Sequence, residues 1–137
     1  MSIKQLFLTV FISSGIASIA CIVYDMLYSQ AFYVNFSIVL TMRATLIVCL
    51  LGCSLMAIAY YLGIKWKGEK IILWINLLII ILSFASIIGI LGFQLPFEIE
   101  SPELFPGLAI PMHFFPALSF LAIVNPMMRY GEKVVVK

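Results

Sequence analysis

Charge is what this sequence has least of. Asp, Glu, Lys and Arg make up 10% of the 137 residues and hydrophobic residues make up 64%, against roughly 25% and 45–50% in a soluble domain. A soluble chain near 150 residues still leaves roughly 30% of its unfolded-state surface exposed, so it has too little interior for this many apolar side chains. The composition argues against a soluble enzyme, a secreted disulfide scaffold and a nucleic-acid-binding protein, and it indicates a membrane protein.

Residues that carry chemistry are also few. His113 is the only histidine, whereas a membrane cytochrome usually offers two axial histidines and a metal site needs a cluster of ligands. The chain has three cysteines, one at position 21 in the first apolar stretch and two, Cys49 and Cys53, in the second. Cys49 and Cys53 lie four residues apart and so lack the CxxC spacing of a thiol oxidoreductase. No Gly-x-Ser-x-Gly motif is present. We therefore expect no cofactor, no metal and no enzymatic activity.

Long apolar runs are abundant. A membrane-spanning helix needs about 20 mostly apolar residues, and four charge-free stretches reach that length, at residues 5–24, 44–64, 71–93 and 104–128. They predict an all-α, four-helix transmembrane bundle that forms a single domain over residues 1–137, with helices at about 5–27, 41–64, 71–94 and 104–128. The first stretch resembles a signal peptide in its small-residue segment at 17–21, but its apolar run is longer than a typical signal sequence, so we expect a retained helix.

The positive charges predict the orientation of the bundle. Seven of the eight cations fall in the segments that four crossings place on one side of the membrane: Lys4, Lys65, Lys67, Lys70, Arg129, Lys133 and Lys137. By the positive-inside rule this side is cytoplasmic. Both termini are therefore expected in the cytoplasm and the acidic segment at 94–103 outside. The net charge of +2 follows from this topology, and we expect no nucleic-acid partner.

Small and weakly polar residues recur along three of the predicted helices. Small residues let helix backbones approach each other closely in lipid, so we expect these stripes to face the interior of the bundle. In the first helix the stripe is Ser14, Ser18, Cys21 and Asp25; in the second it is Thr45, Cys49, Gly52 and Met56; in the third it is Asn76, Ser83, Ser86 and Gly89. Asn76 and Asn125 are expected to form a hydrogen bond between the third and fourth helices.

Four polar residues, one near each predicted helix, are expected to converge in the outer layer of the membrane: Asp25, Arg43, Gln94 and His113. His113 lies roughly 24 Å along a helix from Arg129, within the outer third of the bilayer. An ionisable group at membrane depth is by default a candidate functional site. We predict that Asp25 pairs with Arg43 across the first helical hairpin; the alternative is that both side chains reach towards headgroups or water.

The last predicted helix carries His113 among several prolines. Because Pro111 and Pro116 have no backbone N–H, the carbonyls of Gly107 and Met112 lose their usual helical partners. Free carbonyls and an imidazole together predict a small polar pocket that opens outward, with Pro111 and His113 as candidate ligand-binding residues. The alternative is that His113 is a hydrogen-bonded packing residue.

The stretch at 101–107, Ser-Pro-Glu-Leu-Phe-Pro-Gly, is followed by Pro111, Met112 and His113. This pattern resembles a family of small, uncharacterised bacterial membrane proteins with four transmembrane helices, in which a Pro-Gly segment leads into a last helix bearing Pro-Met-His. The resemblance implies a location in the bacterial inner membrane, singles out Pro106, Gly107, Pro111 and His113, and carries no established activity.

These observations lead to one functional hypothesis and two alternatives. We expect a non-enzymatic multi-pass membrane protein that serves as an accessory or structural subunit of a membrane complex or of a homo-oligomer, with the lipid bilayer and other membrane subunits or copies of itself as partners. One alternative is a small oligomeric transporter or channel, although none of the charged residues lies at mid-membrane depth. The other is a lipid- or quinone-binding protein with an outward-facing pocket near His113.

Overall fold

The computed structural model describes residues 2–92 and 101–135, and for residues 129–135 it describes the backbone alone. Within these ranges the chain forms four α-helices: α1 (Ile3–Phe32), α2 (Met42–Lys67), α3 (Ile72–Leu91) and α4 (Phe105–Val135). Two short 3-10 helices, η1 (Glu69–Ile71) and η2 (Pro102–Leu104), precede α3 and α4. The predicted all-α four-helix fold is confirmed, and all four helices are long and apolar enough to cross a membrane.

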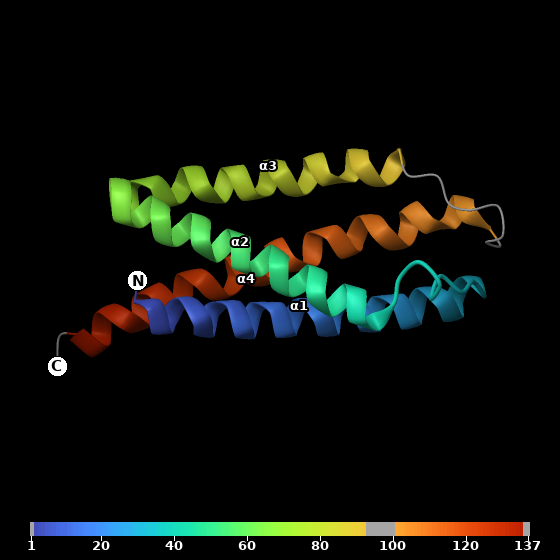
Figure 1. The fold of residues 1–137 in the computed structure, drawn as a ribbon, viewed down its shortest axis with the longest axis horizontal. Coiled ribbons are helices and arrows are strands. Elements are labelled where there is room, and N and C mark those ends of the chain that lie inside the picture. The colour runs from blue at the N-terminus through green and yellow to red at the C-terminus, as the bar shows by residue number, and fades with distance from the viewer. Residues whose placement is uncertain (1, 93–100, 136–137) are drawn as a thin grey trace.

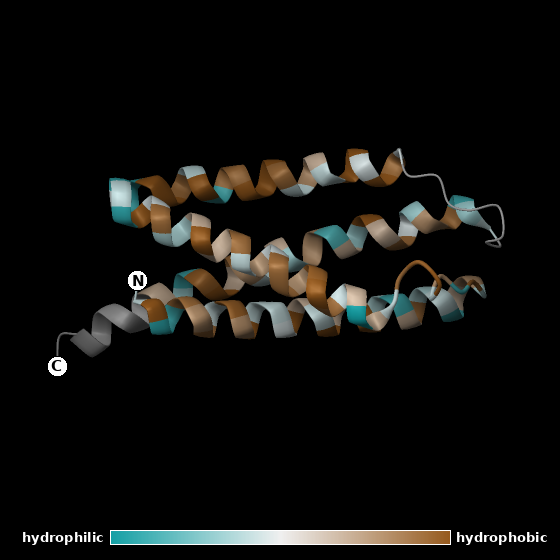
Figure 2. Ribbon diagram, in the orientation of Figure 1, coloured by the Kyte–Doolittle hydropathy of each residue, from teal (hydrophilic) through white to brown (hydrophobic). Residues whose placement is uncertain are grey.

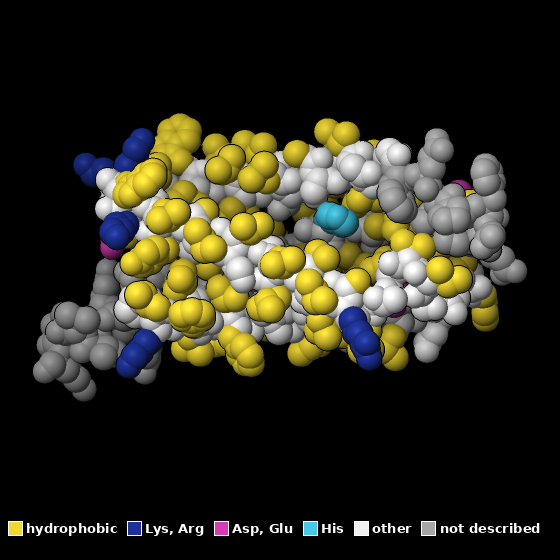
Figure 3. Space-filling view, viewed as in Figure 1, with side chains coloured by type: hydrophobic (Ala, Val, Ile, Leu, Met, Phe, Trp, Pro, Cys, Tyr) yellow, Lys and Arg dark blue, Asp and Glu magenta, His cyan; other side chains and the backbone are white. Residues whose placement is uncertain are grey.

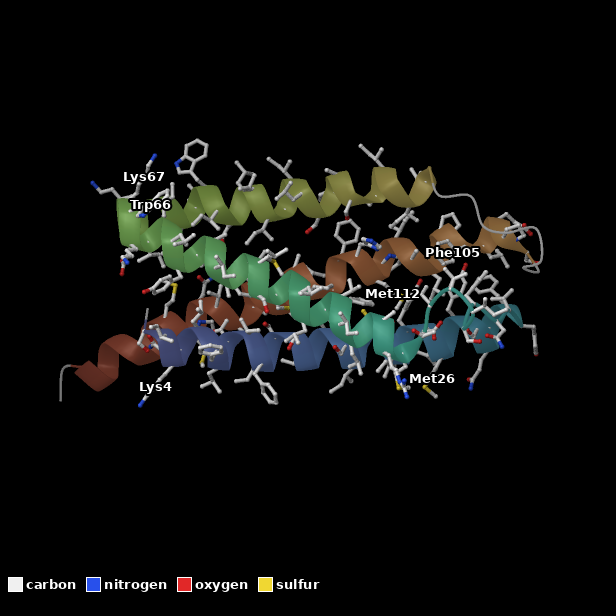
Figure 4. All side chains as sticks on the ribbon, viewed as in Figure 1. Lys4, Met26, Trp66, Lys67, Phe105 and Met112 are labelled. Atoms are coloured by element: carbon white, nitrogen blue, oxygen red, sulfur yellow. The ribbon has the colours of Figure 1, made fainter. Side chains whose placement is uncertain are left out.

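The helices form an elongated antiparallel bundle (Figure 1). α1 begins at the same end of the bundle at which α4 finishes and α2 turns into α3. We call this the basic end, because Lys4, Lys65, Lys67 and Lys70 all lie there; Figure 4 shows Lys4, Trp66 and Lys67 together at this end. Between the two ends the helices are predominantly apolar (Figure 2), which matches a span through hydrocarbon.

The helices differ from their predicted limits at most ends. α1 starts at Ile3 rather than near residue 5, because Ser2 and Gln5 form a reciprocal capping box. It continues to Phe32 rather than stopping near 27, with the ring of Phe32 packed 4.6 Å from that of Tyr28. α2 extends from the predicted 64 to Lys67, where basic residues in its last turn complement the helix dipole.

The remaining differences lie in the second half of the chain. α3 ends at Leu91 instead of 94, where Gly92 caps it. α4 runs to Val135, past the predicted end at 128. Here the apolar run ends before the helix does, because a helix leaving the membrane can continue in water.

Most of the predicted small-residue stripes of α1 and α2 lie in the interior of the bundle: Ser14, Ser18, Cys21, Thr45 and Cys49 are buried, whereas Asp25, Gly52 and Met56 are half-buried. Thr9, Ser13, Ala17 and Cys21 lie on one face of α1, and the buried face of α2 consists of Thr45, Cys49, Cys53, Ala57 and Tyr60. Most large apolar side chains instead point outward, including the 77% exposed Phe11 and the 68% exposed Leu55. This inversion of the soluble pattern fits helices whose outer faces contact lipid.

Candidate functional site

A groove between α2, α3 and α4 is the candidate functional site. Its volume is about 790 Å³, within the roughly 300–1,000 Å³ range of ligand sites. Its walls come from residues 44–56 of α2, 79–90 of α3 and 105–117 of α4, with side chains of Cys21, Val39 and Leu40 added. The space-filling view shows the hollow beside the cyan side chain of His113 (Figure 3). The lining is almost entirely apolar, and it includes no Asp, Glu, Lys or Arg among the described residues.

The groove exists because α2 and α3 meet at the basic end and diverge away from it (Figure 1). At the basic end the Tyr60 hydroxyl donates to Asn76 Oδ1, and Gly63 lets Ile75 pack directly against the α2 backbone. The Tyr60 ring also packs edge-on against Phe120 of α4, with centroids 5.4 Å apart. These contacts close the groove at one end and leave it confined to the half of the bundle away from the basic end.

The predicted stripe on α3 faces the space between the helices, but its part away from the basic end is not packed against a neighbouring helix. Ser83 and Ser86 are half-buried, Gly89 is exposed, and all three line the groove. The expected pairing of Asn76 with Asn125 is also wrong, since Asn76 accepts from Tyr60 of α2 and Asn125 is exposed. The reason is that α3 diverges from α2 away from the basic end (Figure 1), so the polar face of α3 borders the groove there.

His113 lines this groove from α4. It lies eight residues along α4 from Phe105, a distance of about 12 Å, and its side chain is exposed. Its Nδ1 lies 2.9 Å from the carbonyl oxygen of Ala109, one turn earlier. In Figure 4, Phe105 and Met112, on the same part of α4, lie away from the basic end. The ring is therefore anchored on one nitrogen, with its other nitrogen unbonded in the described part of the chain.

The carbonyls that Pro111 and Pro116 free in α4 are satisfied by α1. The Tyr24 hydroxyl donates to the Gly107 carbonyl at 3.0 Å, and the Cys21 thiol lies 3.8 Å from the Met112 carbonyl. These are the two carbonyls that Pro111 and Pro116 deprive of a backbone donor. They face α1, whereas His113 faces the groove, so the structure does not combine carbonyls and imidazole in the predicted polar pocket. Pro111 is half-buried and is not among the lining residues of the groove.

Two further bonds join α1 to η2 and to α4. The Tyr28 hydroxyl donates to the Leu104 carbonyl at 2.8 Å, and Gln5 Nε2 donates to the Met127 carbonyl at 3.3 Å. Neither Tyr24 as a partner of α4 nor Tyr28 as a partner of η2 was predicted from the sequence. The sequence does contain a signal for this contact: Tyr24 and Tyr28 are four residues apart and share a helix face with Cys21, which was expected to point into the bundle.

The other predicted site residues are not gathered around His113. Asp25 is half-buried on α1 and interacts with the hydroxyl of Ser29. Arg43 is exposed on the first turn of α2, and among the described residues no salt bridge joins it to Asp25. Neither residue lines the groove. Gln94 lies outside the described residues.

The three cysteines are all free and buried. Cys21 Sγ lies 3.9 Å from Cys49 Sγ, and both line the groove. The thiol of Cys53 instead lies 3.8 Å from the Pro116 carbonyl. No group of three or more His, Cys, Asp or Glu side chains in the described residues is placed to hold a metal ion. The thiols act here as small packing residues with weak hydrogen bonds.

Comparisons of the chain with protein-family models, with curated proteins and with solved structures found no match.

Proposed function

We propose that this multi-pass membrane protein is a non-catalytic binding protein, and that it holds an apolar, chain-like molecule of the bilayer in the groove between α2, α3 and α4. The observation that carries the proposal is the groove itself: about 790 Å³ of mostly apolar space, bordered by three membrane-spanning helices. Because its walls lie in spanning helices, a molecule enters it sideways from the hydrocarbon layer.

The length of the groove supports a lipid-type chain over a partner helix. Residues 44–56 of α2 extend over about 18 Å, whereas a spanning helix must cross about 30 Å of hydrocarbon. The Tyr60–Asn76 contact and the Gly63–Ile75 packing close the groove towards the basic end. A spanning helix of another subunit would therefore fit along only about half of its length, while a flexible chain can end where the groove ends.

Photolabelling tests this proposal directly. Purified protein in nanodiscs is irradiated with a diazirine-bearing hexadecane, and the labelled peptides are identified by mass spectrometry. We expect labelling of groove residues on α2, α3 and α4 that unlabelled hexadecane competes away. Labelling that is spread evenly over all lipid-facing surfaces and resists competition would rule the proposal out.

A matched pair of substitutions on α3 provides the control. Ser86 lines the groove, whereas its neighbour Ala85 is exposed and does not. Ser86→Phe should fill the groove and reduce the competed labelling severalfold, and Ala85→Phe should leave it unchanged. Equal labelling in both variants would contradict binding within the groove.

Association with another membrane subunit or a second copy is a second candidate, favoured by the exposure of α3. Only 11% of the most apolar window of its span is buried, against 39% for α4. Native mass spectrometry from membrane nanodiscs tests this, and detection of the monomer alone would argue against it. The transporter or channel alternative stays a prediction, as do the bacterial inner membrane and the cytoplasmic placement of the basic end, which rest on the sequence resemblance and the positive-inside rule.

A further inference from the structure

The hydrogen bond that holds His113 determines which of its ring nitrogens can meet a ligand. A backbone carbonyl only accepts hydrogen bonds, so Nδ1, which lies 2.9 Å from the Ala109 oxygen, carries the proton. Within hydrocarbon the neutral form of an ionisable side chain costs far less to hold than the charged form. Among the described lining residues there is no Asp or Glu to stabilise an imidazolium. Nε2 of the neutral ring is therefore a hydrogen-bond acceptor.

The hydroxyl groups that line the groove have already used their donors. Ser83 Oγ donates to the Ile79 carbonyl at 2.9 Å, and Ser86 Oγ donates to the Ser83 carbonyl at 2.7 Å. On α2, Thr45 Oγ1 donates to the Thr41 carbonyl at 3.3 Å. Each of these bonds lies within its own helix, so none depends on what occupies the groove. The described wall of the groove thus presents an acceptor at His113 and no unused hydroxyl donor.

We infer that the occupant of the groove is a long-chain molecule with a hydroxyl group, and that this hydroxyl donates a hydrogen bond to Nε2 of His113. This inference rests on the proposed binding function and adds the chemistry of the polar group. A molecule whose polar atoms only accept, such as an ether or an ester, finds no matching hydroxyl donor in the groove and leaves Nε2 unpaired. His113 is thereby a specificity-determining residue, and the apolar walls hold the chain.

Competition with matched molecules tests the inference. Hexadecanol and hexadecyl methyl ether, which share the chain and differ in the O–H donor, compete against the diazirine-bearing hexadecane on the wild-type protein. We expect the alcohol to compete about fivefold more strongly, which corresponds to the usual net contribution of one hydrogen bond. Equal competition by alcohol and ether would overturn the inference but leave groove binding intact. Absence of any competed groove labelling would instead remove the proposed function on which it rests.

Two variants separate recognition by His113 from a general effect of polarity. His113→Phe keeps an aromatic ring without an acceptor, and we expect the alcohol and ether to compete equally. His113→Gln provides an amide oxygen that can accept, and we expect part of the preference for alcohol to return. The wild-type comparison needs no variant, so the inference stays testable even if His113→Phe does not fold. A preference for alcohol that persists unchanged in a folded His113→Phe protein would overturn the assignment.

Discussion

At the scale of single residues, the Tyr24 hydroxyl donates the hydrogen bond that a backbone amide donates in an ordinary helix. Pro111 has no N–H, and the Gly107 carbonyl that would accept from it accepts from the Tyr24 hydroxyl at 3.0 Å instead. In lipid no water replaces a missing donor, so neighbouring side chains must satisfy such a carbonyl. The Tyr24 hydroxyl thus satisfies the carbonyl that Pro111 frees within α4, and the same bond connects α4 to α1.

The first prediction is that Tyr24→Phe lowers the free energy of unfolding by about 1 kcal/mol, because it leaves the Gly107 carbonyl without a partner. Unfolding in mixed micelles with increasing sodium dodecyl sulfate measures the change. Tyr33→Phe is the matched control: because Tyr33 is 94% exposed, this substitution should leave the free energy of unfolding almost unchanged.

A variant at Pro111 makes this test more specific. Pro111→Ala restores an N–H at position 111, which can donate to Gly107 in the normal helical pattern. In the Pro111→Ala background, Tyr24→Phe should lower the free energy of unfolding by less than half as much as it does in the wild type. An equal cost in both backgrounds would show that the hydroxyl stabilises the protein in some other way.

At the scale of elements, α1 and α4 approach closely where α4 begins. An added Cβ at Gly107 would lie 2.5 Å from the Tyr28 hydroxyl oxygen and 3.3 Å from its ring carbon Cζ. The tyrosine cannot easily move, because its hydroxyl donates to the Leu104 carbonyl and its ring packs on Phe32. Gly107 therefore sets the distance between these two helices.

The second prediction is that Gly107→Ala destabilises the protein by about 1–3 kcal/mol through overpacking against Tyr28. The same micellar unfolding assay applies. Gly15→Ala on α1 is the control, because nothing lies within 4 Å of its added Cβ and alanine favours a helix over glycine by about 0.8–1.0 kcal/mol. If Tyr28→Phe does not relieve part of the Gly107→Ala effect, the proposed overlap is not its cause.

The groove is an outcome of how α3 sits relative to α2. Tyr60 and Gly63 hold the two helices together at the basic end, while Ser83, Ser86 and Gly89 border the open part. The small residues of α3 have the same character as those of α1, yet only the latter are packed. Hydropathy and spacing show which face of a helix is small and polar, but whether a neighbouring helix covers that face depends on the tilt of both.

At the scale of the whole molecule, most of the Lys and Arg side chains visible in Figure 3 gather at the basic end, and η2 lies at the opposite end of the long helices. Such a one-sided distribution of cations orients a protein in the membrane through the positive-inside rule. The described residues contain four helices long and apolar enough to cross a membrane, and the predicted orientation follows from the charges. The groove, which lies in the half away from the basic end, would then open into the outer leaflet.

The third prediction concerns this topology. In a background that replaces the three native cysteines with serine, Ser101→Cys should react with a membrane-impermeant maleimide applied from outside, and Lys67→Cys should react only after the membrane is permeabilised. Ser101 lies directly before η2 and Lys67 is the last residue of α2, so the two positions are at opposite ends of the bundle. The reverse pattern of labelling would invert the orientation.

By itself the sequence determined the membrane class, the four helices and the distribution of charge, because hydropathy and charge belong to each residue and need no partner. It also located the carbonyls that proline frees at Gly107 and Met112, since that loss is local to one helix. Only the tertiary structure decided that Tyr24 and Cys21 of α1 take up those carbonyls, that Asp25 and Arg43 stay unpaired with each other, and that His113 borders an apolar groove. Each of these features depends on the rotation and tilt of one helix against another. The low content of charged residues identifies this chain as a membrane protein, but it does not determine how its helices are rotated or tilted.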